Sequence, residues 1–576
     1  MRNRLAGHCL VSLGLALLCG DLAGREPGDT PQSWLGSLEV GAVRLRLRFD
    51  IRRSGEGPLR CEMTSIDQGN SRVKMDTCQI EGDRLVCTSR RLKVVYEGRY
   101  QQGNTEIVGS FTQAGQSFPL KLKATTPPAP RVHIETWQGT MQAGEREFEF
   151  QFRVLQTADQ VRSVELDSFS EGIGGLYVKP MFQEDGVSFE IVLTKARFVA
   201  KYNAQRDQLD GHWLQNGSRL ALVLKRVELS QTRSVVPPPR PQTPGPPFPY
   251  QVQEVAFTNP SAEITLAGTL TIPTTGGPFP GVILITGSGP QDRDETIMEH
   301  KPFWVLADHL TRAGLAVLRY DERGVGASTG KFTGANSRDL AEDVEAALAF
   351  LKQRAEVDGS QIGLIGHSEG GYVAPMIAAR RDDVAWIVML AGTGVTGDQI
   401  LLNQAERIAR AGGAKETDIS LNRRLQRVLF HAVRAGTSAD QITSKLEAFV
   451  TTLEPEEQKH VAVSAARSGI PQLLDPWFRF FLDYDPSVAL ARVRCPVLVL
   501  NGERDLQVDP ELNLPAIRAA LRAGGNQRFE IHTLSRLNHL FQECRTGLPG
   551  EYRQIEQTMA PVVLERIARW IRQRQR

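Results

Sequence analysis

The chain has 576 residues, of which 41% are hydrophobic, and its 68 basic side chains nearly balance 66 acidic ones. This length predicts several domains, and the apolar fraction is sufficient for packed cores. A formal charge of +2 excludes a strong general attraction to nucleic acid or to an anionic membrane surface. Seven cysteines are too few for a cystine-dense scaffold but allow a disulfide or two.

The first 24 residues have the features of a secretory signal peptide. Arg2 and Arg4 precede a short apolar run over residues 9–19, and small residues follow it. The run is shorter than the about 20 apolar residues of a membrane-spanning helix, so we expect no transmembrane segment. A buried N-terminal helix is the alternative. The sequence therefore predicts an exported protein, periplasmic or extracellular.

Residues 78–87 read as a hairpin, because their pattern is symmetric about a central Gly-Asp pair, a favoured two-residue loop. The hairpin places Cys78 opposite Cys87, within reach of a disulfide bond. An oxidising compartment would permit that bond. Two buried thiols are the alternative, and Cys61 could compete for either partner. We expect neither a metal ion nor a cofactor.

The N-terminal part of the chain contains a duplication. The segment beginning Trp34-Leu-Gly recurs as Trp137-Gln-Gly, and later segments repeat at the same offset of about 103 residues. Apolar and polar residues alternate with period two in both copies, which indicates antiparallel strands with one solvated face. We predict two tandem all-β repeats, barrels or sandwiches, over residues 33–125 and 135–228. Polysaccharide or lipid binding is one hypothesis for them.

A proline-dense segment, residues 229–250, predicts an extended linker. In residues 251–576, continuous apolar runs alternate with amphipathic helical patterns, as expected for a parallel α/β sheet covered on both faces. Residues 395–490 interrupt this alternation and are too long for an ordinary connection. We interpret them as a helical lid. The aromatic residues from Trp477 to Phe481 either line a pocket or anchor the core of the lid.

The α/β part contains two G-x-S-x-G patterns, the mark of a nucleophilic serine at a strand-to-helix turn. In residues 366–370, Ser368 directly follows an apolar strand, and further small residues open a helix behind it. In residues 326–330, Ser328 lies well past its strand. We therefore predict that Ser368 is the nucleophile and that Ser328 is structural.

A serine nucleophile needs a base and an orienting acid, which follow it in the order acid, then histidine, in this type of sheet. Asp505 lies just beyond a predicted strand, at the edge where open α/β sheets place their sites. His539 lies in the loop after the next strand, whereas His532 lies inside that strand. For the oxyanion hole we predict the backbone N–H groups of Ser288, in a glycine-rich turn, and of Glu369.

These motifs together resemble the bacterial α/β-hydrolase serine esterases of the EstD-like (esterase-D-like) family, from about residue 250 to the C-terminus. The resemblance implies an α/β-hydrolase fold and carboxylesterase activity on short-chain acyl esters, with a small-molecule ester as partner and Ser368, Asp505 and His539 as the triad. Thr286-Gly287 stands where wider relatives have His-Gly. The motifs are Ile285-Thr-Gly-Ser-Gly-Pro-Gln-Asp-Arg-Asp-Glu295, Tyr320-Asp-Glu-Arg-Gly-Val-Gly326, Gly366-His-Ser-Glu-Gly-Gly371, Asn501-Gly-Glu-Arg-Asp505 and Leu537-Asn-His-Leu-Phe541.

Two other functions use the same residues. A serine peptidase, such as an aminopeptidase, or an acyl thioesterase would need the same triad and would differ only in its pocket. A cell-envelope binding protein with a degenerate hydrolase is the non-enzymatic alternative. The presence of Ser368, Asp505 and His539 in the required order argues against degeneracy.

Overall fold

The computed structural model describes residues 32–574, so the predicted signal peptide, residues 1–24, lies outside it. Within the described residues no helix is both long and apolar enough to cross a bilayer. The chain divides into two units, residues up to 235 and residues from 238, which are described separately. The ranges left undescribed between the ends are 41–42, 54–58, 67–70, 90–93, 102–104, 114–115, 126–130, 144–145, 158–161, 192–195, 216–217, 236–237, 459–460 and 462.

The first repeat is an antiparallel sheet in the strand order β4-β3-β2-β1-β9-β8-β7-β6-β5. Only Met75 and Asp76 separate its two edge strands along the chain. The Met75 N–H donates to the Cys61 carbonyl of β3, and the Asp76 N–H donates to the Thr88 carbonyl of β6. The sheet is therefore curled until its edges meet. The strands are β1 (Gln32–Val40), β2 (Val43–Arg53), β3 (Leu59–Ser65), β4 (Ser71–Lys74), β5 (Thr77–Glu81), β6 (Arg84–Ser89), β7 (Val94–Gln101), β8 (Glu106–Gln113) and β9 (Gln116–Thr125).

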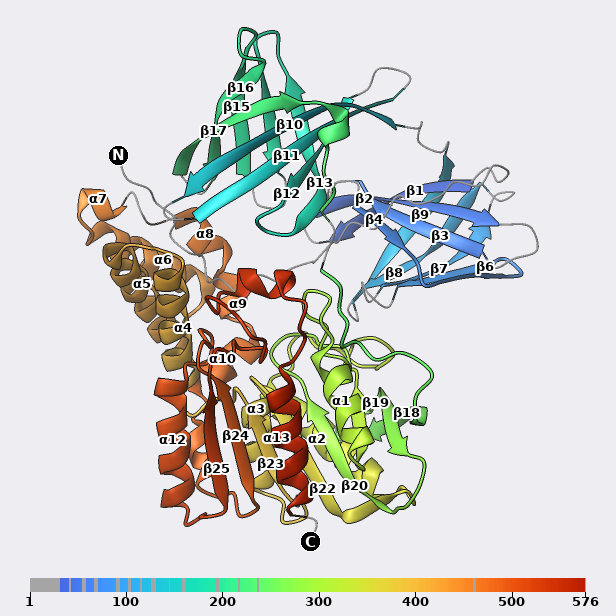
Figure 1. Cartoon of the computed structure of the whole chain (residues 1–576), viewed down its shortest axis with the longest axis vertical. Helices are drawn as coiled ribbons and strands as arrows, with labels where there is room; N and C mark the ends of the chain where they lie inside the picture. The colour runs from blue at the N-terminus through green and yellow to red at the C-terminus, as the bar shows by residue number, and fades with distance from the viewer. Residues whose placement is uncertain are drawn as a thin grey trace. The chain divides into compact units, whose positions relative to one another are not determined.

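The second repeat is a closed barrel in which eight strands follow one another in chain order (Figure 1). Its unbroken strand β13 takes the place that β4 and β5 share in the first repeat, between the strands equivalent to β3 and β6. The strands are β10 (Arg131–Ala143), β11 (Arg146–Thr157), β12 (Arg162–Ser168), β13 (Ile173–Phe182), β14 (Gly186–Ile191), β15 (Ala196–Asn203), β16 (Gln208–Gln215) and β17 (Ser218–Val227).

Strand register shows that the two repeats are copies. Trp34 pairs with Phe49 across β1 and β2, and Trp137 pairs with Phe152 across β10 and β11. All four side chains are buried, as the alternation of inward apolar and outward polar residues requires. The prediction of two tandem all-β repeats is confirmed, and both have barrel character.

The second unit contains an eight-stranded sheet in the order β18-β19-β21-β20-β22-β23-β24-β25. Strands β20 to β25 run parallel, as predicted. Strands β18 and β19 add an antiparallel edge that the sequence pattern did not reveal. The strands are β18 (Tyr250–Asn259), β19 (Ile264–Pro273), β20 (Phe279–Ile285), β21 (Ala316–Tyr320), β22 (Val357–His367), β23 (Ile387–Leu390), β24 (Val497–Gly502) and β25 (Phe529–Leu534).

Helices cover both faces of this sheet. One face packs against α2, α3, α11 and α12, and the other against α1 and α13, which is drawn in dark red in Figure 1. Each strand between them is buried on both sides, which explains the continuous apolar runs. The covering helices are α1 (Pro302–Arg312), α2 (Ser337–Lys352), α3 (Gly370–Ala378), α11 (Pro486–Leu490), α12 (Pro510–Ala523) and α13 (Pro561–Arg572).

The insertion between β23 and β24 is helical, and its first three helices pack side by side (Figure 1). It has a core of its own around Phe430 and Phe478. On α10, Phe478 faces this core while Phe481 joins the core of the main sheet. The helices are α4 (Gly397–Ala411), α5 (Glu416–Arg434), α6 (Ala439–Thr451), α7 (Pro455–Gln458), α8 (Val463–Ser468), α9 (Ile470–Leu473) and α10 (Pro476–Asp483).

Residues 229–250, predicted as an extended spacer, are held by the folded parts on either side. A short 3-10 helix, Leu229–Gln231, is followed by Arg233, whose backbone N–H and carbonyl bond to the side chain of Gln151 on β11. After residue 238, the guanidinium of Arg240 donates to the carbonyls of Arg553 and Ile555. These contacts shorten the part of the segment that can act as a spacer.

Three cysteines of the first repeat lie together. Cys78 is directly opposite Cys87, as the hairpin predicts, and their Sγ atoms are 2.9 Å apart. Cys61 lies beside both, with all three sulfurs within 4.8 Å of one another, and each is a free thiol in the structure. The Cys78–Cys87 disulfide therefore stays a prediction. Hydrogen bonds from Cys61 and Cys87 lower the pKa of Cys78.

We expect mild oxidation of the folded protein to join Cys78 to Cys87, because the thiolate is the attacking species in disulfide formation. Peptide mapping by mass spectrometry would identify the bond, which we expect to raise the free energy of unfolding by about 2–3 kcal/mol. Cys61→Ser should leave the bond intact and Cys78→Ser should abolish it. Recovery of Cys61 in the wild-type bond would contradict this pairing.

Candidate active site

The candidate site lies where the sheet changes direction. In the sheet, β20 lies between β21 and β22, and the helices that follow β20 and β22 lie on opposite faces of the sheet. Ligands of open α/β sheets bind in the crevice at such a switch point. Gly287 and Ser288 follow β20, and Ser368 follows β22 directly. The sheet thus brings the predicted oxyanion turn to the predicted nucleophile.

Ser368 occupies a strained turn between β22 and α3. Its φ of 53° is in the left-handed region, which non-glycine residues adopt rarely. The neighbouring glycines leave space for this turn: a Cβ on Gly366 would lie 1.9 Å from the Gly370 carbonyl oxygen, and one on Gly370 would lie 2.2 Å from the Ile285 carbonyl oxygen. The G-x-S-x-G pattern is therefore a steric requirement of this turn.

The predicted acid and base meet at a hydrogen bond. Nδ1 of His539 lies 2.8 Å from Oδ2 of Asp505, and both residues are buried. The other Asp505 oxygen accepts the backbone N–H groups of Gln507 and Val508, each at 2.8 Å, which holds the carboxylate in place. With the Nδ1 proton directed to Asp505, Nε2 of His539 is free to accept a proton.

The structure shows no hydrogen bond between the Ser368 hydroxyl and the His539 ring. The two loops are nevertheless in contact, because Nε2 of His367 lies 2.9 Å from the His539 carbonyl oxygen and the two imidazole rings are 4.8 Å apart. In ligand-free enzymes the bond between serine and base is often long and closes when substrate binds.

The turn after β20 lies against the nucleophile. A Cβ on Gly287 would be 3.2 Å from Cβ of Ser368. The Gly287 N–H is already used, because it donates to Oε1 of Glu295 at 2.7 Å. The next N–H, that of Ser288, and the N–H of Glu369 have no partner within the described chain. These are the two donors that the sequence predicts for the oxyanion hole.

The side chain of Glu369 connects the nucleophile turn to the lid. The Ser337 hydroxyl donates to one carboxylate oxygen at 2.6 Å, and the indole N–H of Trp477 lies 2.9 and 3.0 Å from the two oxygens. Burial raises the pKa of Glu369, and these donors oppose that shift. Trp477 is on α10, so an aromatic residue of the lid contacts the residue that follows the nucleophile.

Ser328, in the second G-x-S-x-G pattern, has a structural role, as predicted. Its hydroxyl donates to the Asp321 carbonyl at 2.6 Å and accepts the N–H of Ala267 at 2.9 Å. It therefore fastens the loop after β21 to the antiparallel strand β19. Its hydroxyl is buried and already has a donor and an acceptor.

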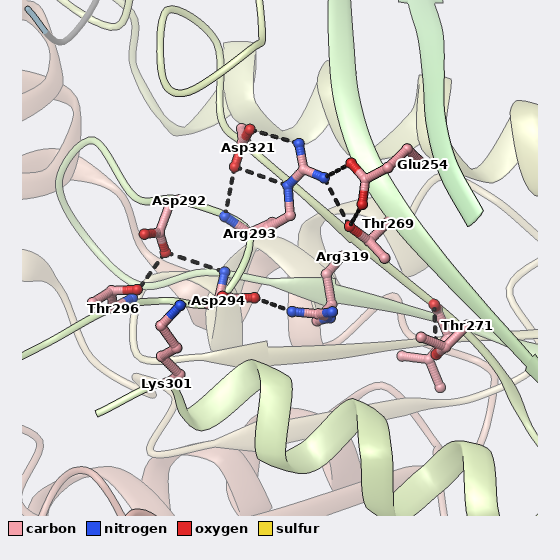
Figure 2. A network of polar contacts seen from close by, with 11 residues as sticks. Glu254, Thr269, Thr271, Asp292, Arg293, Asp294, Thr296, Lys301, Arg319 and Asp321 are labelled. Atoms are coloured by element: carbon pink, nitrogen blue, oxygen red, sulfur yellow. Dashed lines mark hydrogen bonds and ion pairs between the residues drawn. The ribbon is translucent and has the colours of Figure 1, made fainter. Parts of the chain in front are cut away.

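Ionic contacts of two arginines, which the sequence did not assign, hold the turn after β20 (Figure 2). The guanidinium of Arg293 pairs with Asp321, with Nη2 at 2.8 Å from Oδ2, and also donates to Glu254. Arg319, which is buried, pairs with Asp294. The only sequence signal for them is that acidic and basic residues alternate directly after the glycine-rich turn.

Two further residues of the site were also missed. Glu295 and His367 are both buried, and Nδ1 of the His367 ring lies 2.9 Å from Oε1 of Glu295. Both residues lie within the motifs of the sequence, but nothing in the sequence pattern predicted that they contact each other. Among the described residues, the group with the spacing of metal ligands is the cysteine cluster of the first repeat, which lies in the other unit.

Parts of this chain are similar to known proteins. Residues 302–543 match the family described as Serine aminopeptidase, S33. Esterase EstD of Thermotoga maritima is 28% identical over 310 residues, which cover 53% of this chain and 65% of EstD. An uncharacterised Mycobacterium tuberculosis protein is 27% identical over 213 residues, covering 35% of this chain and 67% of that protein. A solved Pyrococcus furiosus esterase aligns with 56% of this chain and 93% of its own, with 16% identity and a TM-score of 0.34.

The second unit has an α/β-hydrolase fold and is similar to esterase EstD. The family resemblance predicted from the motifs is thereby confirmed, as is the fold class of this unit. The chain spans 65% of the length of EstD, less than two thirds of it. The two β-repeats lie in the first unit, which precedes this one in the sequence.

We expect Gly370→Ala to destabilise the EstD-like unit, because its Cβ would lie 2.2 Å from a carbonyl oxygen of β20. Overpacking of this kind costs about 1–3 kcal/mol or more. Thermal unfolding and the rate of labelling of Ser368 by a fluorophosphonate would both report the change. Gly359→Ala is the matched control, since its Cβ would meet only ordinary contacts at 3.7 Å or more. Equal behaviour of the two variants would contradict the steric requirement.

Proposed function

We propose that the protein is a serine carboxylic ester hydrolase that works through an acyl-enzyme on Ser368. The observation that carries the proposal is the buried Asp505–His539 hydrogen bond at 2.8 Å, beside a serine in the strained turn at the switch point of the sheet. The relationship to esterase EstD supports the choice of esters.

In the proposed reaction, Nε2 of His539 takes the hydroxyl proton of Ser368 as the oxygen attacks the ester carbonyl. The Ser288 and Glu369 N–H groups stabilise the negative charge on the carbonyl oxygen. His539 then protonates the leaving alcohol. Water, activated by the same base, hydrolyses the acyl-enzyme, while Asp505 orients the imidazole and stabilises its charged form.

The proposed preference for short acyl chains is supported by aromatic side chains beside the nucleophile turn. The ring of Trp477 stacks on Phe481 with 5.3 Å between centroids, and Tyr372 lies beside Phe481, so rigid aromatic side chains gather next to Glu369. We propose that they offer an apolar surface to the acyl group, as aromatic side chains do in ligand pockets. An aminopeptidase is the second candidate, because residues 302–543 match a family of that description. Export, proposed from residues 1–24, would place the reaction outside the cytoplasm.

Ser368→Ala should abolish the hydrolysis of p-nitrophenyl acetate and butyrate, and Asp505→Asn should lower kcat about 10⁴-fold by favouring the wrong imidazole tautomer. Ser328→Ala is the matched control, because this serine belongs to the same pattern and has a structural role. Initial rates with the esters, an aminoacyl anilide and an acyl thioester would separate the candidate functions. Turnover of esters by Ser368→Ala at the wild-type rate would refute the proposal.

Trp477→Phe should raise KM for short-chain esters about 10-fold, since a hydrogen bond to a charged group contributes about 1.5–3 kcal/mol and this one holds α10 to Glu369. Relative activity on octanoyl esters should rise as the lid loosens. Trp570→Phe makes the same substitution where the indole N–H has no partner in the described chain, and it should leave KM unchanged. An unchanged chain-length preference in Trp477→Phe would show that α10 does not shape the acyl pocket.

A further inference from the structure

His367, the residue before the nucleophile, makes two contacts that together determine the charge of the His367 ring. Nδ1 of His367 is 2.9 Å from Oε1 of Glu295, and Nε2 is 2.9 Å from the carbonyl oxygen of His539. A carbonyl oxygen only accepts, so Nε2 must carry a proton. Oε1 of Glu295 already accepts the Gly287 N–H at 2.7 Å, which favours an ionised carboxylate and a second proton on Nδ1.

We propose that His367 is a positioning residue that acts as an imidazolium, and that with Glu295 it clamps three loops of the site together. The loop after β20 contributes Glu295 and Gly287, the nucleophile turn contributes His367, and the loop after β25 contributes the carbonyl of His539. This inference rests on the proposed function of Ser368 and His539. It assigns roles to two motif residues that touch neither substrate nor the reacting atoms.

The surroundings of His367 support a charged ring. Burial by itself lowers the pKa of His367, but the charge and hydrogen bond of Glu295, the His539 carbonyl and the charge of Asp505 raise it overall. The other groups facing the ring are the imidazole of His539 and the ring of Phe541. Glu295 and Asp505 are the acidic groups here, so with His367 charged the cluster carries a net charge of −1 before His539 accepts a proton.

The backbone of the loop after β20 adopts an unusual conformation at Glu295. Its φ of 52° is left-handed, although glutamate gains nothing locally from that conformation. The bend turns the carboxylate inward, where it is 1% exposed. Because Glu295 binds the Gly287 N–H, the following N–H, that of Ser288, is left for the substrate. The clamp therefore sets the position of the oxyanion donor relative to Ser368.

Glu295→Gln tests the clamp through its pH dependence. The amide oxygen can replace Oε1 as the acceptor for Gly287 and His367, but it carries no charge. Without the Glu295 charge, burial lowers the pKa of His367, so the ring should lose its second proton at a lower pH than in wild type, and one of its two contacts should break. We expect the ratio of kcat in Glu295→Gln to kcat in wild type to fall about 10- to 100-fold as pH rises through this lowered pKa, since small misplacements of catalytic groups cost this much. Any pH dependence that the two proteins share cancels in this ratio.

Two variants bracket this result. Glu295→Ala should have a low kcat at every pH, because the acceptor itself is lost. Glu345→Gln removes a surface carboxylate on α2 that pairs with Arg380, and its ratio to wild type should stay near one at every pH. A pH-independent ratio for Glu295→Gln that matches Glu345→Gln would overturn the proposal.

A second measurement does not depend on ester turnover. In the full-length protein labelled with ¹⁵N-histidine, the His367 ring should show two bonded protons at pH 7.5 in wild type and one in Glu295→Gln, with His367→Asn identifying its signals. A neutral His367 in wild type would overturn the clamp even if the esterase is active. Two protons on His367 in a protein that hydrolyses no ester would instead retain the clamp and reject the proposed function.

Discussion

The left-handed backbone at Ser368 is the constraint on which the rest of the site depends. A side chain held at φ 53° stays there only if its surroundings leave no other conformation available. The Ser368 N–H donates to Leu390 of β23 at 2.8 Å, and Gly370 packs directly on β20. The nucleophile is therefore positioned by three adjacent strands, and it moves only if the sheet moves.

The loops that surround this turn carry no regular structure, and buried charges hold them. Glu295 fastens the loop after β20 to the nucleophile turn, and Asp321 fastens it to the loop after β21 through Arg293. Removing such charges from water is costly, so each remains buried only because its partners are in place. The network thus orders donors before substrate arrives, which is the condition for electrostatic stabilisation of an oxyanion.

The lid and the duplicated β-repeats are attached to the hydrolase sheet in two different ways. The lid is inserted between β23 and β24. Its helix α10 contributes Phe478 to the core of the lid and Phe481 to the core of the sheet. Of the two roles considered from the sequence for its aromatic residues, the structure shows anchoring, since Phe478 packs in the core of the lid and Trp477 binds Glu369, whereas lining of a pocket stays a prediction. The barrels instead form a unit of their own, in which each copy buries its own tryptophan and phenylalanine pair.

Much of the fold and of the candidate site could be predicted from local sequence patterns. Period-two alternation and the repeated Trp-x-Gly segments predicted the tandem β-repeats, and buried runs alternating with helices predicted the hydrolase sheet. The order of Ser368, Asp505 and His539 named the three residues that the fold brings to one edge, because parallel strands all end there. The antiparallel strands β18 and β19 escaped prediction because edge strands have no distinctive run of their own.

Only the tertiary structure decided which groups distant in sequence form hydrogen bonds and pack against one another. The pairing of Glu295 with His367, and of His367 with the His539 carbonyl, joins residues that lie 72 and 172 positions apart. No spacing rule connects them, because the loops that carry them meet only after the sheet has formed. The sequence alone determined the reactive groups, whereas their orientation and charge depend on which acceptors the folded chain places within 3 Å of each nitrogen.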